Sequence, residues 1–319
     1  MGSVCSMLLC EKGFAVRMWG HDAKQLAQIK EKRENFIFLP GHKLPDSLEF
    51  EASNSDILKN AELIISAVPC QYVRRVWKGL AGFANPNVPI VSVTKGIEND
   101  TLLRPSQVIM DVLGERTKVV ALSGPTIAEE IAKKLPATAT AASKDERLAG
   151  AVQEIFSMPY LRVYRNSDIV GVELAGAMKN VIAIAAGIID GIQIGDNAKA
   201  ALLCRGLAEI TRLGMALGAK EHTFSGLSGL GDLVTTCISP SGRNRSFGQR
   251  IGKGASVKDA IEATQSVVEG ITTCKSVVDL AKKNSIDMPI TEAVYHILFE
   301  GKSVSAAIED LMTRKLKAE

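Results

Sequence analysis

The stretch LIISAVP, residues 63–69, is an apolar run rich in β-branched side chains that ends at a proline. Such a run is typical of a strand buried on both faces of a parallel sheet. Two similar runs follow, PIVSVTKG (89–96) and KVVALSGP (118–125), and helix-like stretches at 70–81 and 102–113 separate the three. Strands that alternate with helices predict a doubly wound parallel sheet, so the predicted fold class is α/β.

The chain begins with the pattern of an incomplete dinucleotide-binding unit. Residues 2–12 predict a helix that ends at Gly13, and AVRMW (15–19) predicts a strand. A complete unit has a strand and a G-x-G-x-x-G loop before that helix, whose N-terminus meets the pyrophosphate. Gly2 is what remains of such a loop, so we expect the first strand and the first two glycines to lie upstream of Met1.

The absence of this strand would affect the sheet. In the usual strand order the first strand is central, so without it two neighbouring strands would each carry unpaired backbone groups. We therefore expect that the natural protein starts earlier or that the sequence is a fragment. A second use of Gly2 stays open, because Gly2 and Ser6 also fit the N-myristoylation pattern.

The second half of the chain has a different pattern. From about residue 167 helix-like stretches dominate, and they end in glycine-rich turns such as GLSGLGDL (226–233). The short strand-like stretch LRVY (161–164) comes just before this change. We therefore predict a Rossmann-type dinucleotide-binding domain over residues 1–166, truncated at its N-terminus, and an all-α substrate-binding and catalytic domain over residues 167–319.

Composition excludes several classes of protein. No run of about 18 uncharged apolar residues occurs, so we expect no membrane span. The net charge is only +3 and no dense basic stripe is present, which argues against a nucleic-acid partner and favours a small anionic one. The six cysteines are scattered and form no CxxC pair, which predicts reduced thiols in the cytoplasm and neither a disulfide framework nor a metal site.

Ordered motifs occur along almost the whole chain: WGHD (19–22), NFIFLPG (35–41), AVP (67–69), TKGIE (94–98), SGPTIAEE (123–130), GVELAGAMKNVIAIAAG (171–187), RGLAE (205–209), GLSGLGDL (226–233), RNRSFG (243–248), VVEG (267–270) and MPITEAVY (288–295). Together they resemble the NAD(P)-dependent glycerol-3-phosphate dehydrogenases. The resemblance implies reversible hydride transfer between sn-glycerol 3-phosphate and NAD or NADP, with dihydroxyacetone phosphate as the ketone. It also implies a homodimer that supplies glycerol 3-phosphate for phospholipid synthesis.

Lys179 and Asn180 lie in a stretch of small and apolar residues that predicts a buried helix. On the helical face of Lys179 the neighbours are small, such as Ala175 and Ala183, which leaves room for a ligand. A lysine that reaches solvent or pairs with a structural carboxylate is the alternative. Burial and a second cation lower the pKa of a lysine, which suits a general base. The resemblance makes Lys179 the group that exchanges the proton of the secondary hydroxyl.

Lys95 follows a β-branched run at the end where open α/β sheets bind ligands. The alternative is a solvated turn lysine. The resemblance makes Lys95 a catalytic and substrate-binding cation that polarises the carbonyl oxygen. It also places Gly124 and Thr126 against the substrate and Ala128 against the cofactor. A glycine at a strand end allows close approach of a ligand to the backbone.

Asp232 lies in the glycine-rich turn GLGDL, where helix capping is its alternative role. The resemblance places Asp232 beside Lys179, where it would orient the ammonium group, and gives Thr236 an assisting role one turn later. Both residues are therefore candidates for the substrate site, and Asp232 is also a catalytic candidate.

The turn SGRNR contains the expected phosphate-binding residues. A guanidinium offers a planar fork to phosphate oxygens and an amide adds a neutral donor, and the resemblance assigns these roles to Arg243 and Asn244. A solvated basic face is the alternative, because Arg245 and Arg250 lie close by in sequence. Many bacterial relatives have serine at the position of Gly242, so a contact there would come from its backbone N–H.

The cofactor preference stays open. His21 follows the second strand, near the expected adenosine ribose, and it is not acidic, while Asp22 beside it keeps both NAD and NADP possible. The resemblance implies a set of residues on the cofactor side: Gly2, His21, Phe38, Pro69, Lys95, Ala128, Arg243, Val267 and Glu269.

Two other functions are alternatives. One is a dehydrogenase of the same two-domain plan that acts on a different hydroxy acid or sugar acid. The other is a binding or regulatory protein that has lost catalysis together with its glycine loop. The joint presence of Lys95, Lys179, Asp232 and Arg243 argues against long decay of an active site.

Overall fold

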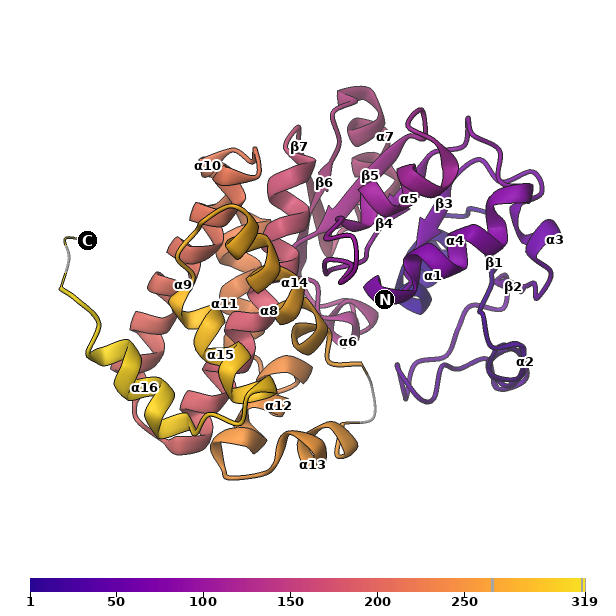
Figure 1. Ribbon diagram of the computed structural model, residues 1–319. Coiled ribbons are helices and arrows are strands. Elements are labelled where there is room, and N and C mark those ends of the chain that lie inside the picture. The colour runs from indigo at the N-terminus through magenta and orange to yellow at the C-terminus, as the bar shows by residue number, and fades with distance from the viewer. Residues whose placement is uncertain (265–266, 317, 319) are drawn as a thin grey trace. The chain divides into compact units, whose positions relative to one another are not determined.

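The structure is a computed structural model that describes residues 1–264, 267–316 and 318. The chain divides into two compact units (Figure 1). Unit 1 comprises Met1–Lys95 and Arg104–Ile169, and unit 2 comprises Gly96–Leu103 and Val170–Glu319. The main division therefore falls at residue 169, close to the expected boundary at 166, but one internal segment clusters with the helical unit.

Unit 1 contains the strands. They are β1 (Arg17–Met18), β2 (Glu49–Phe50), β3 (Ile64–Ser66), β4 (Ile90–Ser92), β5 (Val119–Ser123), β6 (Ala137–Ala142) and β7 (Leu161–Asn166). The three apolar runs predicted as strands form β3, β4 and β5, which are adjacent and parallel, with Ile65, Val91 and Val120 in register. This order brings the carboxyl ends of all three strands to one edge of the sheet.

The predicted parallel sheet is present, and it contains one antiparallel pairing, at β6. This strand pairs antiparallel with β5 and parallel with β7. The sequence of β6 is ATATAA, whose short side chains give no apolar run, so its strand conformation is set by pairing with neighbours and not by its own composition.

The strands β1 and β2 form a separate parallel pair. Among the described strands, β1 pairs only with β2, and β3 pairs only with β4. Helix α1 (Gly2–Glu11) contacts both β1 and β3.

The helices of unit 1 cover the sheet (Figure 1). Besides α1 they are α2 (Ala23–Lys32), α3 (Asn54–Leu58), α4 (Val73–Leu80), α5 (Pro105–Leu113), α6 (Ala128–Ala132) and α7 (Glu146–Phe156), with short 3₁₀ turns at Cys70–Tyr72 and Ala81–Phe83. The core of the unit includes Val4 of α1, Val91, Val120 and Phe156, which are each no more than 1% exposed.

The regular elements described in unit 2 are all helical (Figure 1). They are α8 (Ile169–Ile192), α9 (Asp196–Ala216), α10 (Glu221–Phe224), a π-helical segment (Leu227–Gly231), α11 (Asp232–Ile238), α12 (Arg243–Gly252), α13 (Val257–Glu262), α14 (Glu269–Lys283), α15 (Pro289–Phe299) and α16 (Val304–Met312). This agrees with the prediction of a helical second half.

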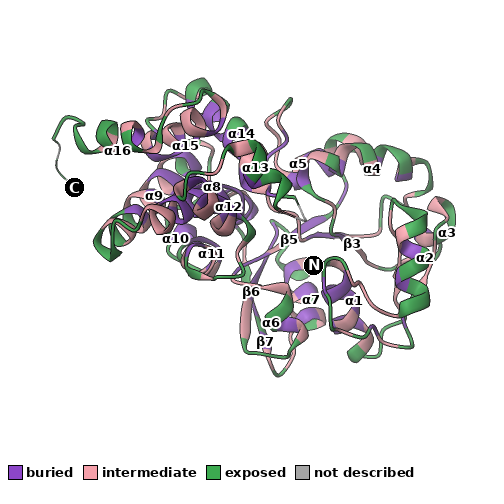
Figure 2. Cartoon of the chain, turned by 90° about the horizontal axis from the view of Figure 1, so that it is seen from below, coloured by how far each residue is buried: buried purple, intermediate pink, exposed green. Residues whose placement is uncertain are grey.

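Helix α8 is the central element of unit 2. It is long and apolar enough to cross a membrane by length and composition, although the sequence was expected to contain no such stretch. However, 89% of its most apolar 18-residue window is buried inside the protein, and Figure 2 shows it enclosed by other helices of the unit. A helix that is apolar all round is typical of a buried core position.

The segment Gly96–Leu103 belongs to unit 2 because its side chains and backbone contact the helices of that unit. Ile97 is fully buried in the core of the helical unit. The hydroxyl of Ser276, on α14, donates a hydrogen bond to the Ile97 carbonyl at 3.0 Å, and lies 2.6 Å from Oδ1 of Asn99. A domain boundary predicted from sequence patterns does not detect a short segment that packs in the other unit.

A buried carboxylate joins two helices of unit 2. Glu209 of α9 is 2% exposed and accepts hydrogen bonds from the backbone N–H groups of Ile290 (2.6 Å) and Thr291 (3.2 Å), in the first turn of α15. It therefore satisfies N–H groups that a helix start leaves without partners. Burial raises the pKa of Glu209 to about 7 from its ordinary 4.5, against the lowering effect of these hydrogen bonds.

The stability of the chain should therefore depend on pH through Glu209. Below pH 4.5 the group is protonated in both states, whereas between pH 4.5 and 7 it ionises only in the unfolded chain. The free energy of unfolding should fall across this range by up to about 3 kcal/mol and stay reduced above it. Urea unfolding of the parent and Glu209→Gln across this range should show that the parent loses more stability than the variant. Parallel pH profiles would contradict the assignment.

Candidate active site

Lys179, near the middle of α8, is held by two side chains of α11. Its Nζ donates hydrogen bonds to Oδ1 of Asp232 at 2.6 Å and to Oγ1 of Thr236 at 2.5 Å. Asp232 begins α11 and Thr236 lies one turn later, so both face the same side of that helix. The structure thus brings Lys179 together with two residues that lie more than 50 positions later in the sequence.

This cluster is almost completely shielded from solvent. The side chains of Lys179 and Asp232 are 7% and 3% exposed. Nearby on α11, burial raises the pKa of the Cys237 thiol to about 12, despite the lowering effect of the Lys179 charge. The carboxylate of Asp232 and the hydroxyl of Thr236 thus hold the Lys179 amine at a fixed place. It can deliver a proton to, or take one from, an oxygen atom that comes close.

Asn180 connects Lys179 to helix α12. The amide of Asn244, on α12, donates through Nδ2 to Oδ1 of Asn180 at 3.0 Å, and its own Oδ1 accepts from the backbone N–H of Gly270 at 2.9 Å. Asn244 is 9% exposed. Asn244, the amide expected to bind the phosphate, is therefore fixed beside Asn180, which directly follows Lys179.

Gly270 is a site residue that the sequence interpretation did not single out. A Cβ at this position would lie 2.7 Å from the Asn180 carbonyl oxygen and 2.8 Å from Oδ1 of Asn244. Only a glycine fits there without displacing the two asparagines. The signal was available, because Gly270 ends the motif VVEG (267–270).

The start of α12 carries the candidate phosphate cation. Arg243 is its first residue and donates through a terminal guanidinium nitrogen to the carbonyl of Val267 at 3.2 Å. Val267 is exposed, and Glu269 begins α14 two residues later. The backbone N–H of Gly242 donates to the Ser239 carbonyl at 3.1 Å, so it is engaged within the turn and not directed at a ligand as expected.

In unit 1, three expected substrate residues meet at the carboxyl ends of β4 and β5. The carbonyl of Gly124 accepts hydrogen bonds from Nζ of Lys95 at 3.0 Å and from Oγ1 of Thr126 at 3.1 Å. Gly124 has φ of +141°, and a Cβ there would lie 3.0 Å from the Thr138 carbonyl oxygen. Open α/β sheets bind ligands at this edge, so these groups are well placed for one.

Three expected cofactor residues of unit 1 also lie beside strand ends. Pro69 follows β3, and Ala128 begins α6 after β5. Gly2 begins α1, where a Cβ would lie 3.3 Å from the Cβ of Ala67, just after β3. The start of α1 therefore packs closely against the carboxyl end of β3, as the helix that meets a pyrophosphate must. These residues fit a dinucleotide.

His21, expected near the adenosine ribose, and Phe38, expected on the cofactor side, are both on the surface. His21 is exposed, and Phe38 is 54% exposed in a loop where its N–H donates to Oδ1 of Asn35 at 3.3 Å. Asp22 caps α2 by accepting from the N–H groups of its first turn, and the hydrogen bond from Gln25 lowers the pKa of this carboxyl. The carboxylate beside His21 thus serves as a helix cap.

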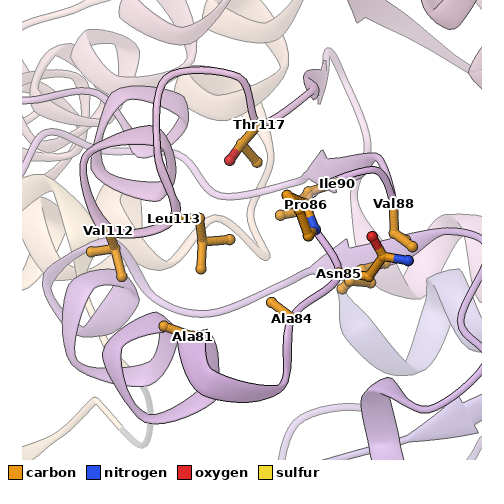
Figure 3. Close-up of a pocket in the computed structure, with 10 residues that line it drawn as sticks. Ala81, Ala84, Asn85, Pro86, Val88, Ile90, Val112, Leu113 and Thr117 are labelled. Carbon is orange, nitrogen blue, oxygen red and sulfur yellow. The ribbon is translucent and has the colours of Figure 1, made fainter.

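A separate cavity of about 250 Å³ lies at the opposite edge of the sheet (Figure 3). Ile64 and Ile90, which begin β3 and β4, line it together with Thr117, which precedes β5. Its lining side chains are uncharged. It therefore lacks the cations that an anionic substrate requires, and it is distinct from the edge that carries Lys95.

Comparison with known proteins agrees with these two groups of residues. Residues 1–149 match the family described as NAD-dependent glycerol-3-phosphate dehydrogenase N-terminus, and residues 168–309 match the corresponding C-terminus. Curated relatives named glycerol-3-phosphate dehydrogenase [NAD(P)+] are 46% identical in Citrifermentans bemidjiense and 48% identical in Prosthecochloris aestuarii. Each alignment covers 100% of this chain and 96% of the relative.

Solved structures give the same result. The crystal structure of glycerol-3-phosphate dehydrogenase from Coxiella burnetii has a TM-score of 0.94 and 34% identity, and the match covers 98% of this chain and 97% of that one. A ketopantoate reductase from Ralstonia eutropha, with a TM-score of 0.59 and 13% identity over 98% of this chain and 97% of that one, shares the fold alone. The chain belongs to the NAD-dependent glycerol-3-phosphate dehydrogenase family.

Proposed function

We propose that this chain catalyses the reversible reduction of dihydroxyacetone phosphate to sn-glycerol 3-phosphate, with NADH or NADPH as the reductant. The observation that carries the proposal is the Lys179–Asp232–Thr236 cluster, joined through Asn180 and Asn244 to the start of α12. A buried proton donor and a nearby phosphate-binding helix start are what a phosphorylated ketone needs.

Lys179 and Asp232 each have a defined role in the proposed reaction. The nicotinamide cofactor supplies the hydride that reaches C2 of the ketone. As negative charge develops on the C2 oxygen, the Lys179 ammonium donates a proton to that oxygen, while Asp232 holds the amine in place. In the reverse direction the neutral amine takes the hydroxyl proton. The sum is ketone, NAD(P)H and one proton giving alcohol and NAD(P)⁺.

The phosphate is assigned to the start of α12. A helix start offers backbone N–H groups to an anion, and Arg243 adds a full positive charge with planar donor geometry. Asn244 adds a neutral donor, and Gly242 supplies the turn that leads into the helix. In unit 1, Lys95, Gly124 and Thr126 are assigned to the substrate.

The cofactor assignments follow the family resemblance. They comprise Gly2, His21, Phe38, Pro69, Lys95, Ala128, Arg243, Val267 and Glu269. We further propose that the protein acts as a cytoplasmic homodimer without a membrane span and supplies glycerol 3-phosphate for phospholipid synthesis. The burial of α8 and the free cysteines support a soluble protein in a reducing compartment.

Replacement of Lys179 tests the chemical step. Lys179→Met should lower kcat for dihydroxyacetone phosphate by about 100-fold or more, because general acid catalysis typically contributes at least that factor. The Kd for NADH should stay within about twofold. Lys258→Met, which removes an exposed lysine of α13, is the matched control and should keep full turnover. Equal loss of NADH binding and of turnover would show that Lys179 is a structural residue.

Replacement of Arg243 tests the phosphate assignment. Arg243→Ala should raise KM for dihydroxyacetone phosphate by about 10- to 100-fold, the range for loss of a hydrogen bond to a charged group. Arg250→Ala removes another arginine of α12, one that donates to Thr264, and should leave this KM nearly unchanged. The phosphate role of Arg243 is refuted if its KM equals that of the parent.

A further inference from the structure

Asp190, near the end of α8, holds two cations from two other helices. It accepts from Nζ of Lys199, on α9, at 2.7 Å and from Nε of Arg245, on α12, at 2.6 Å. The three side chains are only 14–19% exposed, so solvent screens these contacts weakly. A neutral residue at position 190 would leave two cations facing each other.

The contact between α8 and α12 is also fixed by their backbones. A Cβ at Gly187 would lie 1.9 Å from the carbonyl oxygen of Arg245, and a Cβ at Gly248 would lie 2.0 Å from that of Ile184. Gly191 and Gly252 repeat this pattern one turn later. The helices therefore meet main chain to main chain, so α12 has little freedom to shift sideways on α8.

Asp190 and Lys179 lie on the same face of α8. They are eleven positions apart, which is close to three turns of a helix with 3.6 residues per turn, or about 16 Å along its axis. At one level of α8, Asn180 binds Asn244, and at the other level Asp190 binds Arg245. Two neighbouring residues of the first turn of α12 are thus tied to two separate turns of α8.

We infer that Asp190 is a positioning residue that sets the phosphate-binding start of α12 relative to Lys179. The inference rests on the proposed function. Arg245 carries the effect, because it follows Asn244 directly and its guanidinium is the group that Asp190 holds. The glycine contacts limit the distance between the helices, and the ion pair selects the position of the first turn along α8.

The test compares Asp190→Asn with the parent chain. The variant keeps the size of the side chain but loses its charge, so KM for dihydroxyacetone phosphate should rise roughly tenfold, while kcat and the KM for NADH should stay within about twofold. Calorimetric titration with sn-glycerol 3-phosphate should show the same roughly tenfold weakening of Kd. Asp310→Asn, which removes the partner of Lys302 beside α16, is the matched control and should change none of these constants.

A second variant separates positioning from folding. Arg245→Gln removes the same contact from the other side. The double variant with Asp190→Asn should raise KM and Kd for the phosphate esters little more than either single variant, because both changes break one interaction. An unchanged KM and Kd in Asp190→Asn would overturn the inference and leave the proposed function standing. So would additive effects in the double variant, or a lowered melting temperature with unchanged constants. Failure of the parent to bind or reduce these phosphate esters would overturn both the proposed function and this inference.

Discussion

A lysine ammonium buried in the most apolar helix of the chain can persist only if a carboxylate is buried beside it. Lys179 and Asp232 meet this condition, because Nζ of Lys179 lies 2.6 Å from Oδ1 of Asp232. This contact constrains the position of helix α11 in unit 2. Helix α11 must begin where Asp232 can reach α8, and Thr236 must follow one turn later to accept a second hydrogen bond from the Lys179 amine. The cost of removing two charges from water is offset by their attraction, and the result is a proton donor of fixed position.

The parallel strands β3, β4 and β5 and the family motifs could be predicted from the sequence because their signals are local. Three apolar runs each predicted a strand, and the roles of the glycines and polar residues of the motifs were implied by the resemblance to the family. The antiparallel strand β6 could not be predicted, because ATATAA has no strong preference of its own. The place of Ile97 in unit 2 could not be predicted either, because it depends on contacts with α14, far away in sequence.

The same limit applies to the site. The identity of Lys179, Asp232 and Arg243 as candidates followed from motifs, but the hydrogen bonds between Asn180, Asn244 and Gly270 are tertiary. The engagement of the Gly242 N–H within its own turn was also outside the reach of residue patterns. Residue type therefore indicated which chemistry is possible, whereas the packing of helices in unit 2 determines which groups meet.

The most direct measurement is oxidation of NADH and of NADPH by the parent chain, with dihydroxyacetone phosphate compared with unphosphorylated dihydroxyacetone. We expect turnover with the phosphate ester and a kcat/KM lower by at least about 100-fold without the phosphate, because the charged start of α12 then has no partner. Equal rates with both ketones, or turnover with neither, would contradict the claim that this fold reduces a phosphorylated ketone.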